Sequence, residues 1–204
     1  MGKSESIRPV AGELHPAENR GLRELYLFAR HVAHHWGGLA GRLSGSPLAG
    51  VLSRGADSAR SLIHELGPAT AAHGLHGKPA AEGAGVTLAR QRASMRDRFL
   101  EVNQAARFAV EDLQHVVTLL GYLEGLTRAS DHAELAELMG RWERKLRRLE
   151  NEARRAVAAL GNDPDTAIEP LDSSPLGRAA HGAGYAIGTL GEWVDRKVAG
   201  RRTS

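Results

Sequence analysis

The 204-residue sequence contains no cysteine. This absence excludes disulfide frameworks, thiolate-bound zinc or iron–sulfur centres, and a cysteine nucleophile. A metal ion would have to be held by histidine, aspartate and glutamate side chains. Several catalytic motifs are also missing: the chain has no Gly-x-Ser-x-Gly nucleophile elbow, no P-loop and no dinucleotide-binding fingerprint. The sequence therefore favours a protein without enzymatic activity.

Aromatic residues make up only 4% of the chain, whereas 42% of all residues are hydrophobic and 25% are charged. Leu, Ala and Val must therefore fill the core, and this composition suits helices better than sheets. No apolar run approaches the roughly 18 residues of a membrane span, and the N-terminus has no signal-peptide core. We expect a cytoplasmic protein without a membrane span.

Lysine is scarce, because only four of the 27 basic side chains are lysine. An excess of arginine together with much Ala and Gly is typical of GC-rich, bacterial coding. The formal net charge is only +3. The charge balance by itself therefore does not identify a partner.

Apolar residues recur at alternating spacings of three and four in four stretches, which predicts four amphipathic helices. We expect these helices at residues 16–43, 46–66, 86–127 and 130–160. The second helix should end at Gly67-Pro68, and the third, at about 60 Å, should be the longest. The predicted fold is all-α: an up-and-down antiparallel four-helix bundle with an additional helix.

The predicted organisation has four parts. Residues 1–15 form a flexible tail, 16–160 the bundle, 161–173 an extended linker, and 174–200 a C-terminal helix docked on the bundle or on a partner. Between the second and third helices, the Gly- and Ala-rich residues 67–85 predict a long flexible loop.

Histidines 31, 34 and 35 cluster in the first predicted helix, in a chain with ten histidines. A helical wheel centred on Val32 places His31 and His35 at the edge of the apolar face, with His34 pointing outward. Glu24 lies on the same edge. The pattern predicts a transition-metal site made of Glu24, His31 and His35; otherwise the histidines are edge residues beside the core.

A metal-binding bundle of the ferritin-like or hemerythrin-like type needs further ligands from the facing helices. Glu65 in the second helix and Asp112 in the third are the candidates, because both lie near an apolar edge. The second and fourth helices contain no Glu-x-x-His motif, so the full di-iron ligand set is not matched.

The C-terminal helix contains glycines that cost an isolated helix about 1 kcal/mol each. Gly184 and Gly188 belong to a row of small residues that lets another backbone approach closely, and Tyr185 and Trp193 flank this row as anchors. The helix is therefore predicted to pack on its own bundle, on a second copy, on a protein partner or on a membrane surface.

The fourth helix contains basic residues interleaved with glutamates, and we single out Arg144 and Arg148 as partner-binding candidates. The favoured hypothesis is a non-enzymatic interaction or assembly protein that binds a protein partner or self-associates through its C-terminal and basic helices. The first alternative is the metal-binding bundle described above. A nucleic-acid-binding accessory protein is the further alternative.

Overall fold

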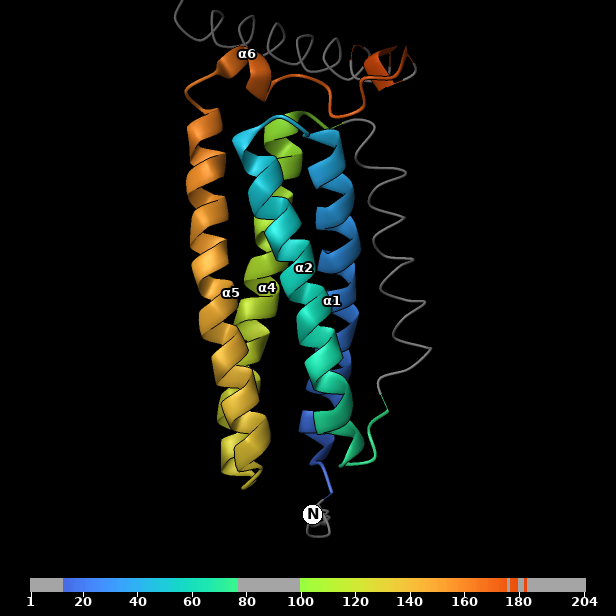
Figure 1. Cartoon of the computed structure of the whole chain (residues 1–204), viewed down its shortest axis with the longest axis vertical. Helices are drawn as coiled ribbons and strands as arrows, with labels where there is room; N and C mark the ends of the chain where they lie inside the picture. Colours follow the sequence, from blue (N-terminus) through green and yellow to red (C-terminus); the bar gives the residue numbers. More distant parts are fainter. Residues whose placement is uncertain (1–12, 77–99, 176, 180–181, 183–204) are drawn as a thin grey trace, which may run out of the picture.

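The computed structural model of the chain describes residues 13–76, 100–175, 177–179 and 182. Four long helices lie side by side along one axis (Figure 1): α1 (Pro16–Arg42), α2 (Pro47–Ala71), α4 (Val102–Ala129) and α5 (Ala133–Leu160). Both α1 and α5 pack on α2 and α4, so α1 and α5 lie on a diagonal. Every packed pair is antiparallel, which confirms the predicted all-α antiparallel four-helix bundle.

Helices α2 and α4 point in the same direction, as Figure 1 shows. The chain leaves α2 at the lower end of the bundle and begins α4 at the upper end. The connection through residues 77–99 therefore joins opposite ends of the bundle, and the structure of the predicted flexible loop lies largely outside the described residues. None of the helices in the described part of the chain combines the length and the hydropathy that crossing a membrane requires.

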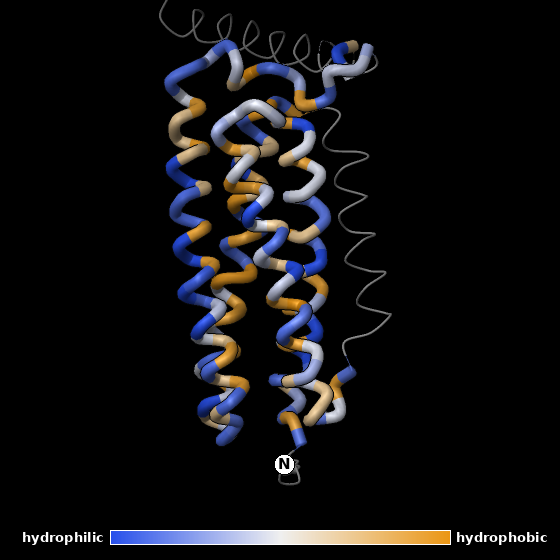
Figure 2. Tube along the Cα trace, viewed as in Figure 1, coloured by the Kyte–Doolittle hydropathy of each residue, from blue (hydrophilic) through white to orange (hydrophobic). Residues whose placement is uncertain are grey.

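The core is built from one apolar side of each helix, and Figure 2 shows hydrophobic positions gathered on the inner sides of the bundle. Leucine and alanine dominate it, as the low aromatic content predicts. Among the described residues, Trp36 and Trp142 are the largest fully buried side chains.

Trp36 connects three helices. Its ring lies against Gly55 of α2, where an added Cβ would come within 2.1 Å of the indole Cε3. Its Nε1 donates a hydrogen bond to the carbonyl oxygen of Ala109 on α4, 3.0 Å away. Each contact requires Trp36 to lie opposite one particular residue. Trp36 therefore fixes the position of α1 along the axes of α2 and α4.

The lower end of the bundle is fastened by Glu18, whose side chain is fully buried. One carboxylate oxygen accepts the backbone N–H of His15 at 2.6 Å and caps the start of α1. The other contacts Nδ1 of His132, the residue before α5, at 2.8 Å. This buried carboxylate therefore joins the beginnings of two helices.

The predicted boundaries of α1 and α2 are only partly right. The turn after α1 contains Gly45 at φ 93°, as the Ser-Gly-Ser sequence indicates. The predicted end of α2 at Gly67-Pro68 is wrong, because the helix continues to Ala71 and the chain turns at Gly74, with φ 73°. Burial of Leu66, Thr70 and Leu75 outweighs the cost of an internal proline.

The predicted length of the third long helix is also wrong. α4 begins at Val102, and its 28 residues equal the length of α5. Just before it, Glu101 forms an antiparallel bridge with Pro170, and the Leu100 carbonyl accepts the Leu171 N–H at 3.0 Å. Because this carbonyl is committed to the bridge, the helix begins only after it. Residues 86–99 of the predicted helix lie outside the described residues.

The linker and the C-terminal segment also differ in detail. The predicted extended linker at 161–173 contains a short helix, α6 (Pro164–Ala167), capped by Asp163. The expected cap of the C-terminal helix is present, since Ser174 Oγ accepts the N–H of Gly177 at 3.0 Å. Most of residues 174–200 and nearly all of the 1–15 tail lie outside the described part of the chain.

Replacing Gly55 by alanine tests the contact with Trp36. The new methyl group would overlap the indole, so we expect a loss of about 1–3 kcal/mol in the free energy of unfolding. The control is Gly50→Ala in the same helix, where the nearest atom is a flexible Arg54 nitrogen 3.7 Å away. That change should stabilise the protein by about 0.5–1 kcal/mol. Urea unfolding of both variants measures the difference, and equal stability would contradict the packing argument.

Candidate metal centre

The histidines of α1 lie on the side of the helix that faces α4. Because His31 and His35 are four residues apart, they share one face of the helix. Tyr26 lies on the other side of the buried arc, where its hydroxyl contacts Thr70 Oγ1 of α2 at 2.9 Å. α1 therefore buries a wide arc against two neighbouring helices, and the two histidines form its α4 side.

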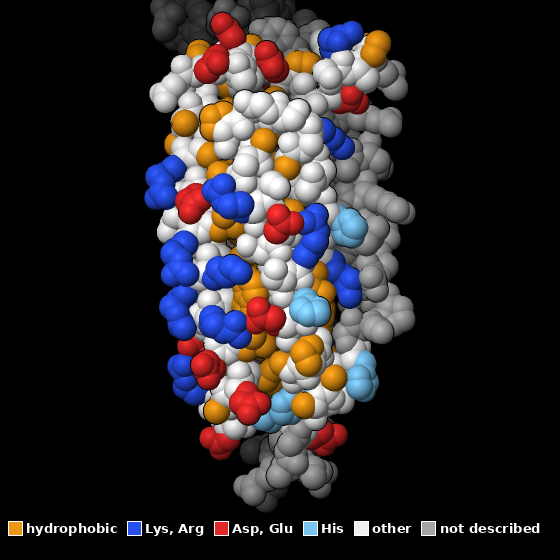
Figure 3. Space-filling model, viewed as in Figure 1, with side chains coloured by type: hydrophobic (Ala, Val, Ile, Leu, Met, Phe, Trp, Pro, Cys, Tyr) orange, Lys and Arg blue, Asp and Glu red, His pale blue; other side chains and the backbone are white. Residues whose placement is uncertain are grey.

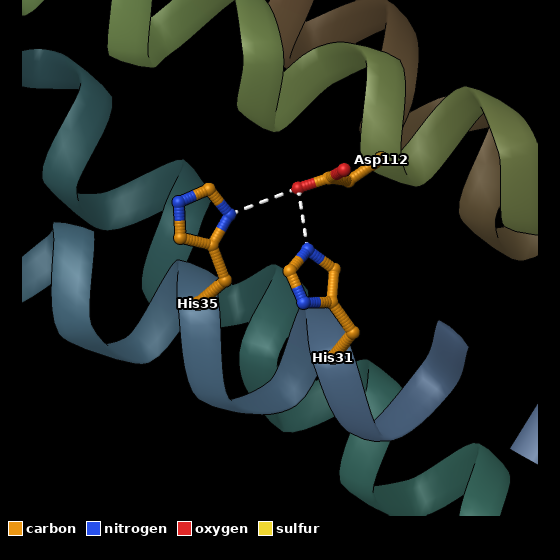
Figure 4. Close-up of side chains that lie close together, drawn as sticks. All are labelled: His31, His35 and Asp112. Atoms are coloured by element: carbon orange, nitrogen blue, oxygen red, sulfur yellow. Dashed lines mark hydrogen bonds and ion pairs between the residues drawn. The ribbon is translucent and has the colours of Figure 1, made fainter. Parts of the chain in front are cut away.

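Asp112 of α4 joins the two imidazoles, as Figure 4 shows. Its Oδ2 lies 2.9 Å from His31 Nε2 and 2.9 Å from His35 Nδ1. The two rings stack with their centroids 5.2 Å apart. The exposed fraction is 0% for His31, 6% for His35 and 4% for Asp112, so the three residues form a buried polar cluster inside the bundle. We call it the His–Asp–His cluster.

Burial by itself would raise the pKa of Asp112, because a charged carboxylate is costly to remove from water. The hydrogen bonds and charges of His31 and His35 outweigh this effect and hold the pKa of Asp112 well below its usual range. The carboxyl group is therefore ionised and accepts hydrogen bonds from both rings. His31 Nε2 and His35 Nδ1 are the donors, which leaves His31 Nδ1 buried with no hydrogen-bond partner.

The cluster has the ligand types that a transition metal requires. One ligand atom from each side chain lies within 4.8 Å of the others. Two imidazoles and one carboxylate suit Zn²⁺, Fe²⁺ and related ions, and they leave coordination positions for water. A metal at about 2.1 Å from each nitrogen would draw the rings together. With Nε2 bound to the metal, Nδ1 of His31 would be the protonated nitrogen, and it would need an acceptor such as water.

The structure brings together two of the three ligands predicted from the first helix. Glu24 lies apart, in a contact of 3.0 Å between its Oε1 and His115 Nε2, with both side chains nearly half exposed. Of the two candidates on facing helices, Asp112 belongs to the cluster. Glu65 instead accepts hydrogen bonds from α5, from Arg141 at 2.9 Å and from Trp142 Nε1 at 3.1 Å.

The placement of His31 and His35 at the edge of the core is wrong, because both are buried. The helical wheel assumed one apolar direction, whereas α1 packs on two helices and buries a broader arc. The sequence does contain one signal for the third member of the cluster. Asp112 directly precedes the core residue Leu113, and this position puts a carboxylate at the margin of the apolar face of α4.

Only some of the residues predicted to bind a partner lie within the described part of the chain. Gly184, Tyr185, Gly188 and Trp193 lie outside the described residues. Arg144 and Arg148 lie on α5 and are exposed.

A cleft of about 560 Å³ lies at the upper end of the bundle. Its walls come from the turn between α1 and α2, the end of α5 and residues 163–173. None of the buried titratable side chains in the described part of the chain lines this cleft. The His–Asp–His cluster is therefore the stronger candidate for chemistry, since perturbed buried groups gather at functional sites.

No family model matches this chain, and neither the curated proteins nor the solved structures compared with it contain a significant match. The functional argument therefore rests on the geometry of the site.

Asp112→Asn tests the ionised carboxylate. A group whose pKa is lowered on folding contributes stability above its unfolded pKa of about 3.9 and loses that contribution as the pH falls further. We expect the wild type to exceed the variant in unfolding free energy near neutral pH by about 1.5–3 kcal/mol. The excess should shrink below about pH 4, by up to about 1.4 kcal/mol per pH unit. The measurement is urea unfolding between about pH 3 and 7.

Glu111→Gln is the control for this experiment, because Glu111 precedes Asp112 in the chain and is exposed. Its substitution should change stability by no more than about 0.5 kcal/mol. A wild-type excess over Asp112→Asn that stays constant down to pH 3 would contradict the lowered pKa.

Proposed function

We propose that this protein is a metal-binding helical bundle that holds one divalent transition-metal ion with His31, His35 and Asp112. The observation that carries the proposal is the convergence of their three ligand atoms within 4.8 Å at a buried point between α1 and α4. Helical bundles form metal centres in their core from side chains of facing helices, histidines and carboxylates among them.

The ligand chemistry narrows the choice of ion. Imidazole nitrogen suits zinc, iron, copper and nickel, whereas calcium and magnesium prefer sites made of oxygen ligands only. In a chain without cysteine, the site has no thiolate to favour Cu(I) or an iron–sulfur cluster. Two histidines with one carboxylate match known ligand sets of catalytic zinc and of non-haem Fe(II), so Zn²⁺ and Fe²⁺ are the ions that we expect to be bound.

The number of protein ligands also has a consequence. Three ligands do not complete the four-coordinate shell of zinc or the six-coordinate shell of iron, so one or more positions are left for water or another small ligand. The ionised carboxylate of Asp112 offsets part of the charge of a divalent ion. The burial of all three side chains excludes most bulk water, which strengthens this attraction.

The test is a titration of chelator-treated protein with Zn²⁺ by calorimetry and with Co²⁺ by visible absorption. We expect one ion per chain and a Co²⁺ spectrum typical of nitrogen and oxygen ligands. At a free Zn²⁺ concentration of about 100 Kd, the unfolding free energy should rise by about 2.7 kcal/mol.

Variants assign the ligands. His35→Gln and Asp112→Asn should each weaken Zn²⁺ binding at least about tenfold, because each removes a ligand or its charge. His34→Ala is the matched control, since His34 lies between the two ligands in sequence but is exposed. Circular dichroism checks that each variant is folded. Absence of binding to the folded wild type, or equal affinity of all three variants, would contradict the proposal.

A further inference from the structure

The basic residues of α5 fall into two groups when the ion pairs are assigned. In the segment 141–155, the glutamates are Glu143, Glu150 and Glu152. Glu143 pairs with Arg147, Glu150 with Arg154, and Glu152 with Arg54 of α2. Every acidic side chain of this segment is thus neutralised by a specific arginine.

Three further arginines remain on the same helix: Arg144, Arg148 and Arg155. All three are exposed, and none has an ion pair or hydrogen bond within the described part of the chain. At 100° per residue they lie within about 40° of one another around α5 and extend over about 16 Å of its length. We call these three residues the arginine stripe. Figure 3 shows a column of basic side chains along this side of the molecule.

Neighbouring cations differ from the stripe because they are already engaged. Lys145 Nζ lies 4.1 Å from the ring centroid of Trp142, in a cation–π contact. Arg141 forms an ion pair with Glu65 at 2.9 Å. The arginines of α5 that have no acidic partner among the described residues are therefore those of the arginine stripe.

We infer that the arginine stripe binds the phosphate backbone of double-stranded nucleic acid. Duplex DNA presents one negative charge per about 1.7 Å of its axis when both strands are counted, so a 16 Å length carries about nine phosphates, more than enough for each of the three guanidinium groups to contact one. Arginine is suited to this contact because its planar group donates two parallel hydrogen bonds to phosphate oxygens.

The surroundings of the stripe favour a polyanion over an acidic protein. Protein interfaces depend on buried aromatic or aliphatic anchors at their centre. Among the described residues, the exposed large hydrophobic side chains are Tyr122 and Ile168, and neither belongs to α5. A surface with charge and no apolar anchor matches the sequence-independent recognition of phosphates.

Fluorescence anisotropy with a labelled mixed-sequence DNA duplex of about 20 base pairs tests this inference, because phosphate contacts make affinity depend on salt. We expect binding at low salt, and log K against log salt concentration should have a slope of about −2.7 for three phosphate contacts. The triple variant Arg144→Gln/Arg148→Gln/Arg155→Gln should bind the duplex at least about tenfold more weakly than the wild type at low salt.

The control removes three positive charges elsewhere: Arg20→Gln/Arg23→Gln/Arg107→Gln, on α1 and α4, where all three arginines are exposed. This variant has the same net charge as the stripe variant and should keep most of the wild-type affinity. No binding of the wild type at low salt overturns the inference, and so does an equal loss in both variants. Neither outcome bears on the metal site, since none of these residues belongs to the His–Asp–His cluster.

Discussion

The packing of α1 against two neighbouring helices is the constraint on which the rest of the structure depends. A helix that contacts both α2 and α4 must bury a wide arc, and in this sequence that arc includes His31 and His35. Polar groups buried without hydrogen bonds are costly, so α4 has to supply an acceptor at this level. Asp112 is that acceptor, which makes the candidate metal centre a consequence of how the bundle closes.

Trp36 determines where along the helices this meeting occurs. Its indole occupies the space over Gly55, and its Nε1 donates to the carbonyl oxygen of Ala109, three residues before Asp112. A shift of α1 by one turn would move the histidines about 5.4 Å from the carboxylate. The fit of one large aromatic side chain against a glycine therefore positions the polar cluster beside it.

The surface of α5 follows a different physical principle. Exposed ion pairs contribute little to stability, so the interleaved arginines and glutamates chiefly set the charge pattern. Once the glutamates of the segment 141–155 are paired with arginines, the three arginines of the stripe have no ion pair among the described residues. The net charge of the whole chain, +3, does not reveal this local row. The molecule thus has two distinct candidate sites: a buried cluster with ligands for a cation and an exposed row of arginines for which we propose a polyanion.

The sequence by itself determined the fold class and most of the core, because the spacing of apolar residues in a long helix directly reports its buried side. It also placed His31 and His35 on one face and marked Asp112 as a margin residue. Only the tertiary structure decided the helix ends. Burial of side chains on both sides of Pro68 lets α2 continue to Ala71, and the bridge to residues 169–171 makes α4 begin at Val102. The separation of Glu24 from the cluster was likewise decided there. Which polar side chains meet depends on the relative position of two helices, and a pattern within one helix contains no information about its neighbour.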